Sequence, residues 1–153
     1  MALTWKTSFS GKEYRIFRGK LIVGILKTSM WKEDAYGELN GYMLLFKPLG
    51  FWKKTTQILD IEGKRELGKI EYNWWKSSAT ITYEEVLYEW KYQSWSRKSW
   101  DVKGPEESVN FLLSSLWRNE GNIEYEDTPG AVILAALYVQ SHFSKVTSAA
   151  LIS

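Results

Sequence analysis

Apolar and polar side chains alternate along most of the first hundred residues. Between residues 79 and 83, Ala79, Ile81 and Tyr83 alternate with two threonines, and residues 86–92 alternate an aromatic or aliphatic side chain with Leu, Glu or Lys. Successive side chains of a strand point to opposite faces, so this period of two is typical of a half-buried antiparallel sheet. Both stretches are therefore predicted strands.

Shorter runs of the same kind are separated by Gly, Asn, Asp and Lys at spacings near ten residues. We expect the segment 21–26 to be buried on both faces, because apolar residues occupy both sides of it. The turns between the runs are short, which favours an antiparallel meander of roughly eight to eleven strands. The further predicted strands are 14–16, 21–26, 36–39, 41–46, 57–61, 66–74 and 100–102, with 123–125 as one more short strand.

The period changes after residue 103. Pro105, Glu106 and Glu107 are residues that a helix N-terminus accepts, and Val109, Leu112, Leu113, Leu116 and Trp117 follow at helical spacing. This pattern predicts an amphipathic helix that ends near residues 118–121.

A second helix is predicted from Thr128 to Val146, with Thr128 as its N-cap and Pro129 at its first position. Residues 131–139 are nine consecutive apolar residues and would cover every face of that helix. They rise about 14 Å, against roughly 30 Å of bilayer hydrocarbon, so protein is expected to surround them. We therefore predict a single domain over residues 1–153, mainly β (α+β). Its expected architecture is a closed antiparallel barrel of roughly 10–12 strands around a buried C-terminal helix, plus the amphipathic helix.

Two stretches are similar to a known superfamily. The hairpin from Ile58 to Ile70, with its Asp60, Gly63 and Gly68, and the apolar helix from Pro129 to Val146 resemble the tubby C-terminal-like superfamily. That superfamily includes phospholipid scramblases and LURP-one-related proteins. The resemblance implies a β-barrel closed around a central hydrophobic helix. Lipid scrambling is not implied, because the chain lacks the Cys cluster and the acidic calcium loop of scramblases. Tubby domains bind phosphoinositides through a basic pocket that has no residue-by-residue match here.

Composition supports one folded domain. The chain has 153 residues, 44% of them hydrophobic and 16% aromatic, with nine Trp, no Cys and a net charge of +2. Disorder and disulfide or thiolate-metal frameworks are thereby excluded. The first residues lack the apolar core of a secretory signal, so a cytoplasmic location is expected.

Charge is uneven along the chain. Lys and Arg outnumber acids in residues 1–70, and acids outnumber bases in residues 71–153. The basic half could attract an anionic lipid headgroup or phosphate, or it could be an ordinary solvated surface. The candidate headgroup-binding residues are Arg15, Arg18, Lys53, Lys54, Lys64 and Arg65.

No catalytic signature is present. His142 is the only His, which excludes His-pair metal sites, and we expect it to lie near the end of the helix with a satisfied ring nitrogen. Gly-rich phosphate loops are missing, so no cofactor is expected. Glu84-Glu85 and Glu106-Glu107 are adjacent pairs, which is the wrong geometry for an acid/base dyad. Carboxylates that only the fold brings together stay open as an alternative.

The nine tryptophans divide into two groups. Those at predicted strand ends or turns are candidates for surface contacts with sugar rings or lipid headgroups. The others are expected in the core. The surface candidates are Trp74, Trp75, Trp95 and Trp100; the core candidates are Trp5, Trp31, Trp52, Trp90 and Trp117.

Three hypotheses follow. The first is a non-enzymatic module that binds anionic phospholipid or phosphoinositide headgroups reversibly at a membrane surface. The second is a carbohydrate- or small-ligand-binding barrel, such as a lipocalin-like cup, that uses exposed Trp. The third is an enzyme with fold-assembled carboxylates. A helix inside the barrel favours the first, and a helix outside an open cavity favours the second. Nucleic acid is an unfavoured partner at a net charge of +2, and no prediction is made for the oligomeric state.

Overall fold

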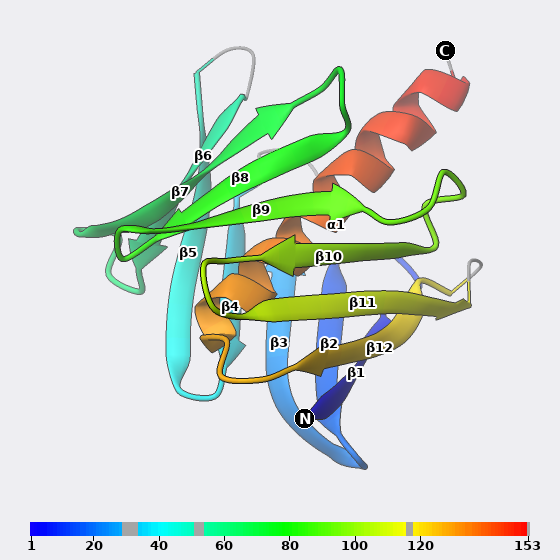
Figure 1. The fold of residues 1–153 in the computed structure, drawn as a ribbon, viewed down its shortest axis with the longest axis horizontal. Coiled ribbons are helices and arrows are strands. Elements are labelled where there is room, and N and C mark those ends of the chain that lie inside the picture. Colours follow the sequence, from blue (N-terminus) through cyan, green and yellow to red (C-terminus); the bar gives the residue numbers. More distant parts are fainter. Residues whose placement is uncertain (29–33, 51–53, 116–117, 153) are drawn as a thin grey trace.

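A computed structural model shows twelve strands and one helix in the residues it describes, which are 1–28, 34–50, 54–115 and 118–152; side chains are described as far as Ser144. Every strand pairs antiparallel with its neighbours in the chain, and β1 pairs with β12 to close the barrel (Figure 1). The closed barrel and the enclosed C-terminal helix confirm the predicted architecture. The strands are β1 Ala2–Thr7, β2 Glu13–Arg18, β3 Leu21–Thr28, β4 Ala35–Leu39, β5 Tyr42–Leu49, β6 Thr55–Asp60, β7 Glu66–Asn73, β8 Ser78–Tyr83, β9 Val86–Tyr92, β10 Ser99–Lys103, β11 Ser108–Ser115 and β12 Glu120–Tyr125.

The seam between β1 and β12 joins the two ends of the sheet. Leu3 lies opposite Ile123 and Trp5 opposite Gly121. A Cβ at Gly121 would overlap the Trp5 indole and the backbone carbonyl of Leu112, so the large Trp5 side chain requires glycine here. The Met1 amino group donates a hydrogen bond of 2.8 Å to the Tyr125 carbonyl and extends the seam by one residue.

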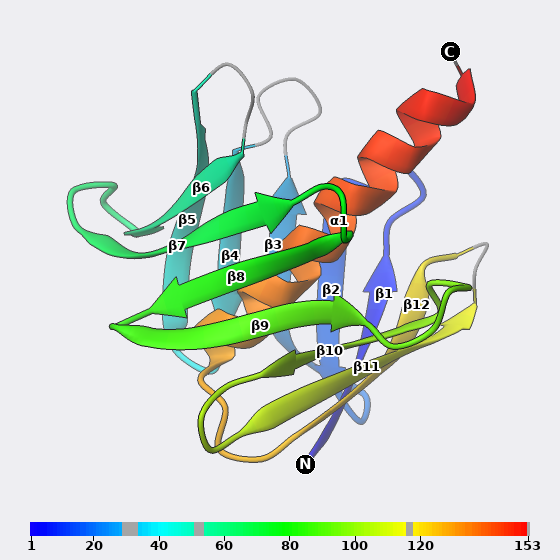
Figure 2. The ribbon, with the colours of Figure 1, turned by 45° about the horizontal axis from the view of Figure 1, so that its top comes forward.

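The helix α1 (Gly130–Ile152) passes through the barrel and leaves at the opposite end (Figures 1 and 2). Residues 131–139 are all at most 3% exposed, because the barrel wall surrounds them on every side. The Trp90 indole Nε1 donates to the Ala136 carbonyl at 3.1 Å, and Phe46 stacks on Tyr138 with ring centroids 4.9 Å apart. The wall and the helix therefore form one core. Within the described residues, no helix is long and apolar enough to cross a membrane.

The amphipathic helix predicted from Pro105 to near residues 118–121 is wrong. Residues 108–115 form β11, which pairs with β10 and β12. Val109 and Phe111 point into the core, whereas Leu112 is 54% exposed on the outer face. The strand β1 was not predicted, although Leu3 and Trp5 alternate with Ala2, Thr4 and Lys6.

Three local predictions also need correction. Segment 21–26 is not buried on both faces, because Leu21 and Ile22 are exposed at the end of β3, beside a register shift in β2. Thr128 is not the N-cap of the helix. Its hydroxyl donates to the Glu126 carbonyl at 3.2 Å, and the helix starts at Gly130, one residue later than predicted. His142 is not near the helix end. It lies ten residues before Ile152, buried, with its ring stacked on Tyr72 at 4.3 Å.

Candidate functional site

The two ends of the barrel differ in chemistry. In a closed antiparallel meander, alternate connections lie at the same end. Six connections therefore lie where α1 leaves the barrel, and we call their described residues the exit end. They are β1–β2, β3–β4, β5–β6, β7–β8, β9–β10 and β11–β12. The other connections lie where α1 begins, and we call them the start end. The exit end comprises residues 8–12, 34, 50, 54, 74–77, 93–98 and 118–119, and the start end comprises 19–20, 40–41, 61–65, 84–85, 104–107 and 126–129.

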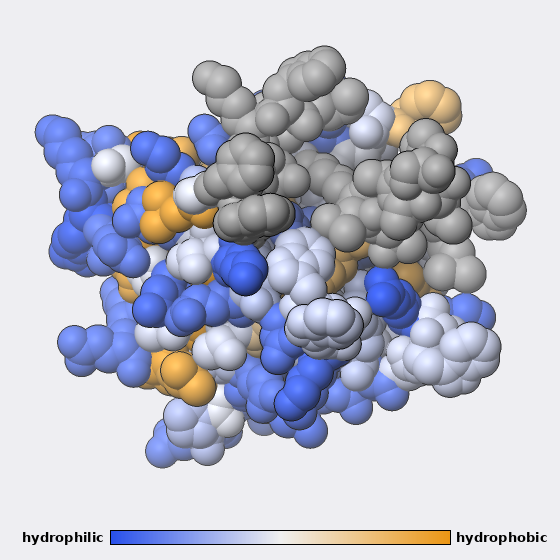
Figure 3. Space-filling model, turned by 90° about the horizontal axis from the view of Figure 1, so that it is seen from above, coloured by the Kyte–Doolittle hydropathy of each residue, from blue (hydrophilic) through white to orange (hydrophobic). Residues whose placement is uncertain are grey.

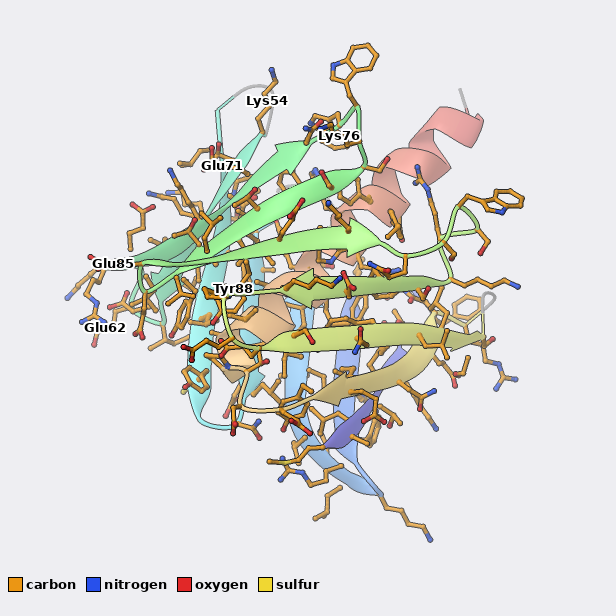
Figure 4. All side chains as sticks on the ribbon, in the orientation of Figure 1. Lys54, Glu62, Glu71, Lys76, Glu85 and Tyr88 are labelled. Atoms are coloured by element: carbon orange, nitrogen blue, oxygen red, sulfur yellow. The ribbon has the colours of Figure 1, made fainter. Side chains whose placement is uncertain are left out.

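The exit end is basic and aromatic. Among its described residues, the single acid is Asp34, beside six exposed cations and several aromatic side chains. In the space-filling view from above, blue hydrophilic and pale side chains lie beside and below the grey residues, and orange hydrophobic ones gather mainly toward the left, the side of the start-end residues Glu62 and Glu85 (Figures 3 and 4). The cations are Lys12, Lys54, Lys76, Arg97, Lys98 and Arg118, and the aromatic residues are Phe9, Trp74, Trp75 and Trp95.

The start end has the opposite charge. Its acids are Glu62, Glu84, Glu85, Glu106, Glu107, Glu126 and Asp127, and its bases are Lys20, Lys64 and Arg65. Figure 4 shows the separation: Lys54 and Lys76 lie along the upper edge, while Glu62 and Glu85 lie together at the left edge. This imbalance between the two ends differs from the imbalance along the sequence. Four of the six exit-end cations belong to residues 71–153, where acids outnumber bases, and all three start-end bases belong to residues 1–70.

Two of the four surface Trp candidates are fully exposed. Trp75 is 99% and Trp95 is 97% exposed, and each sits at the tip of an exit-end hairpin. Trp74 is only half-buried, because its ring packs against Phe143 at 5.5 Å and against the His142 ring at 5.1 Å. The hairpin is thereby fastened to α1 through Trp74, which leaves Trp75 projecting into solvent.

The surface role predicted for Trp100 is wrong. Trp100 is 1% exposed, stacked on Phe111 at 5.4 Å and in contact with Trp5 at 5.5 Å. It points inward because it is in register with Phe111 on β11 and with Tyr92 on β9. Trp5 and Trp90 are buried as predicted, and Trp31, Trp52 and Trp117 lie outside the described residues.

The predicted basic residues do not form one site. Lys54 lies at the exit end, whereas Arg18, Lys64 and Arg65 lie at or beside the start end. Arg15 is on the outer wall and pairs with Glu13 at 3.0 Å, and Lys53 lies outside the described residues.

The turn that carries Lys64 and Arg65 is organised around a carboxylate. Asp60 Oδ1 accepts hydrogen bonds from the backbone N–H of Lys64 at 2.8 Å and of Arg65 at 3.1 Å. The backbone N–H groups of Arg65 and Lys64 hold the pKa of Asp60 below its usual range. These two cations therefore sit in a structural turn, on the end of the barrel where acids predominate.

Sequence reasoning missed the cations that do lie beside the exposed tryptophans, namely Lys76, Arg97 and Lys98. Trp75 directly precedes Lys76, and Trp95 is followed within three residues by Arg97 and Lys98. That adjacency of Trp and base within turns was the available signal.

Arg97 lines a hollow between the β7–β8 and β9–β10 hairpins. Its guanidinium lies 5.1 Å from the centre of the Tyr92 ring, and its Nη2 donates to the Ser77 hydroxyl at 3.2 Å. The hollow has a volume of about 360 Å³. We call it the Arg97 hollow; its lining includes Lys76, Ser77, Tyr92, Gln93, Trp95 and Arg97.

A second hollow, of about 450 Å³, collects acids at the start end. The fold thus brings carboxylates together, as the enzyme hypothesis required. Most of them are exposed to water, however, whereas a glycosidase acid is shielded from it. Glu107 accepts a hydrogen bond of 2.6 Å from the Tyr88 hydroxyl, and burial together with this bond raises the pKa of Tyr88. No group of His, Asp and Glu in the described residues could hold a metal ion. The acids of this hollow are Glu106, Glu107, Glu124, Glu126 and Asp127.

Comparison with known proteins adds no relative: no family model, curated protein or solved structure matches the chain. The resemblance to the tubby-like superfamily stays a prediction, and the site has to be judged on its own chemistry.

Proposed function

We propose that this chain is a non-enzymatic module that binds anionic phospholipid surfaces reversibly through the exit end of its barrel. The observation that carries the proposal is the placement of the fully exposed Trp75 and Trp95 beside Lys76, Arg97 and Lys98. An exposed indole combines a large apolar body with a polar N–H, and Trp is enriched at the level of lipid headgroups.

The cations supply the second part of the attraction. Each Lys or Arg close to an anionic leaflet contributes about 1 kcal/mol, and this contribution falls off within a Debye length. Six exposed cations lie at the same end as the exposed aromatics, and Asp34 is the one acid among the described connecting residues there. Electrostatic attraction and shallow insertion of aromatic rings therefore act on the same face.

The acids at the start end favour one orientation. An anionic surface would repel the end that carries Glu62, Glu84 and Glu85, so the barrel would approach with the exit end first. In this orientation Lys64 and Arg65, two of the candidate headgroup-binding residues from the sequence, would face away from the lipid.

The alternative function, ligand binding inside a lipocalin-like barrel, needs an open interior cavity. Residues 131–139 of α1 fill the space in which such a barrel holds its ligand. Sugar binding on the exposed Trp alone would not need the cations, so dependence on salt and on charged lipid distinguishes the two functions.

Liposome co-sedimentation tests the proposal. We expect binding to vesicles with phosphatidylserine and little binding to pure phosphatidylcholine, with a marked loss at about 0.5 M salt because screening shortens the Debye length. The double variant Lys76→Glu/Lys98→Glu should bind at least tenfold more weakly. The matched control is Lys64→Glu/Arg65→Glu, which makes the same charge change at the start end and should lose far less. Absent binding, salt-insensitive binding, or an equal loss in the control would contradict the proposal.

A further inference from the structure

The Arg97 hollow has features of a site for one small ligand, beyond those of a generally basic surface. Its volume of about 360 Å³ lies within the range of roughly 300–1,000 Å³ typical of small-molecule sites. It lies between two hairpins, and its described lining contains no acid.

The cation in this hollow is held in place. Arg97 has a φ of 62°, in a turn closed by a hydrogen bond of 3.1 Å from its N–H to the Ser94 carbonyl. Its guanidinium is fixed by the Tyr92 ring on its own hairpin and by the Ser77 hydroxyl on the neighbouring hairpin. Burial raises the pKa of Tyr92, with Arg97 opposing the shift, so the ring stays neutral under the guanidinium. A guanidinium already held in position loses little conformational entropy when an anion binds, and its planar fork matches the oxygens of a phosphate.

The remaining lining fits a polyol ring. Trp95 is 97% exposed and presents an indole face on which the C–H face of a sugar ring can stack. Gln93 and Ser94 offer amide and hydroxyl groups for ring hydroxyls, and Lys76 adds a second positive charge. An aromatic platform next to a fixed guanidinium matches a ligand with a ring and an anion at opposite sides.

We propose that the Arg97 hollow binds a phosphorylated sugar or cyclitol ring, with the ring on Trp95 and the phosphate on Arg97. The ligand is either a soluble sugar phosphate or the headgroup of a membrane lipid. In the second case the inference rests on the proposed function, since the hollow lies on the face that would meet the bilayer.

Isothermal titration calorimetry with the full chain tests the soluble source. Glucose 6-phosphate should bind at least tenfold more tightly than glucose or inorganic phosphate, because only the phosphorylated ring uses both halves of the site. Arg97→Gln should weaken this binding at least tenfold, and Trp95→Ala should weaken it as well. The matched control is Arg65→Gln: this exposed cation lies at the start end, outside the proposed membrane-binding residues, and does not line the hollow, so its loss should change the affinity less than about twofold.

The position of the ligand can be read by NMR. The indole N–H resonance of Trp95, assigned by its disappearance in Trp95→Phe, should shift on titration, while that of the buried Trp90 should not. Equal affinities for glucose 6-phosphate and inorganic phosphate, or equal losses in Arg97→Gln and Arg65→Gln, would overturn the site.

Vesicles with phosphatidylinositol 4-phosphate, matched in total charge to phosphatidylserine vesicles, test the lipid source. Preferential binding of the phosphoinositide that Arg97→Gln abolishes would support the inference. Binding to both vesicle types alike, with no calorimetric binding of glucose 6-phosphate, would overturn the inference and leave the proposed function standing. Binding of glucose 6-phosphate without binding to any vesicle would support the hollow as a soluble-ligand site and overturn the membrane function.

Discussion

Tyr14 connects the barrel wall to the helix through a buried polar cluster. Its hydroxyl donates to Gln140 Oε1 at 2.7 Å and accepts from Asn119 Nδ2 at 2.9 Å. Gln140 Nε2 also donates to the Ser144 hydroxyl at 3.1 Å. Buried polar groups are costly unless they are satisfied, so these bonds fix how far α1 is threaded through the barrel.

This cluster predicts a loss of stability in alkali. Burial raises the pKa of Tyr14 to about 12 from 10.0. The unfolded chain would lose the proton of Tyr14 near pH 10 and the folded chain only near pH 12, so the stabilisation is complete below pH 10 and is lost as the pH rises through 12. The loss amounts to about 2–3 kcal/mol over that window. Urea denaturation of the wild type between pH 9 and 12 should show this decline.

The variant Tyr14→Phe is the control for that decline. It should be less stable than the wild type at pH 8, by about 1–3 kcal/mol, because Gln140 and Asn119 each lose a partner. Its stability should nevertheless fall less steeply above pH 10. Parallel declines in the two proteins would show that other tyrosines, such as Tyr88 or Tyr92, dominate the alkaline loss.

At the scale of elements, two substitutions in β11 distinguish the observed strand from the predicted helix. Phe111 faces the core at 1% exposure, and the adjacent Leu112 is 54% exposed. On the predicted amphipathic helix the burial would be the reverse, with Leu112 on the apolar face and Phe111 off it. Phe111→Ser should therefore destabilise the protein by about 3–5 kcal/mol, and Leu112→Ser should change its stability by less than about 1 kcal/mol. Thermal denaturation of the two variants measures this contrast, and a larger loss for Leu112→Ser would contradict the strand.

The contrast also shows where sequence patterns suffice. The strands β8 and β9 were predictable, because aromatic and β-branched residues alternate strictly with polar ones. In the sequence from 109 to 116, Val109, Leu112, Leu113 and Leu116 fit a helical period, whereas Val109, Phe111 and Leu113 fit the period of a strand. The pairing with Trp100 on β10 decides the outcome, and that partner is not visible from the local pattern.

The candidate site was predictable only in its residue types. Basic residues and turn tryptophans were identified, but grouping them by halves of the sequence combined Lys54 with Lys64, which lie at opposite ends. The two lysines flank the predicted strand 57–61, and consecutive connections of a meander lie at opposite ends, so their separation could have been derived from the predicted strands. The end at which the helix emerges could not, because β11 was predicted as a helix and the number of strands between each turn and α1 was therefore wrong.

At the scale of the whole molecule, the barrel and the helix depend on each other. The inner wall carries large aromatic side chains such as Trp5, Trp90 and Trp100, and α1 presents small residues toward it, including Ala135 and Ala136. A slim helix lets a closed sheet with bulky inner residues reach the packing density of a protein interior. The same threading leaves the six hairpins of the exit end arranged around the emerging helix (Figure 2).

We therefore expect that removal of α1 abolishes the fold. Without residues 128–153, the inner faces of the wall would enclose water in place of Val132, Leu134 and Leu137, and Trp90 would lose its acceptor on Ala136. The remaining chain should be insoluble, or should lack cooperative thermal unfolding and near-ultraviolet circular dichroism. The matched control ends after Ser144 and retains the buried core as far as the structure describes side chains. It should stay soluble and unfold cooperatively. A folded, soluble chain 1–127 would show that the sheet closes without its helix.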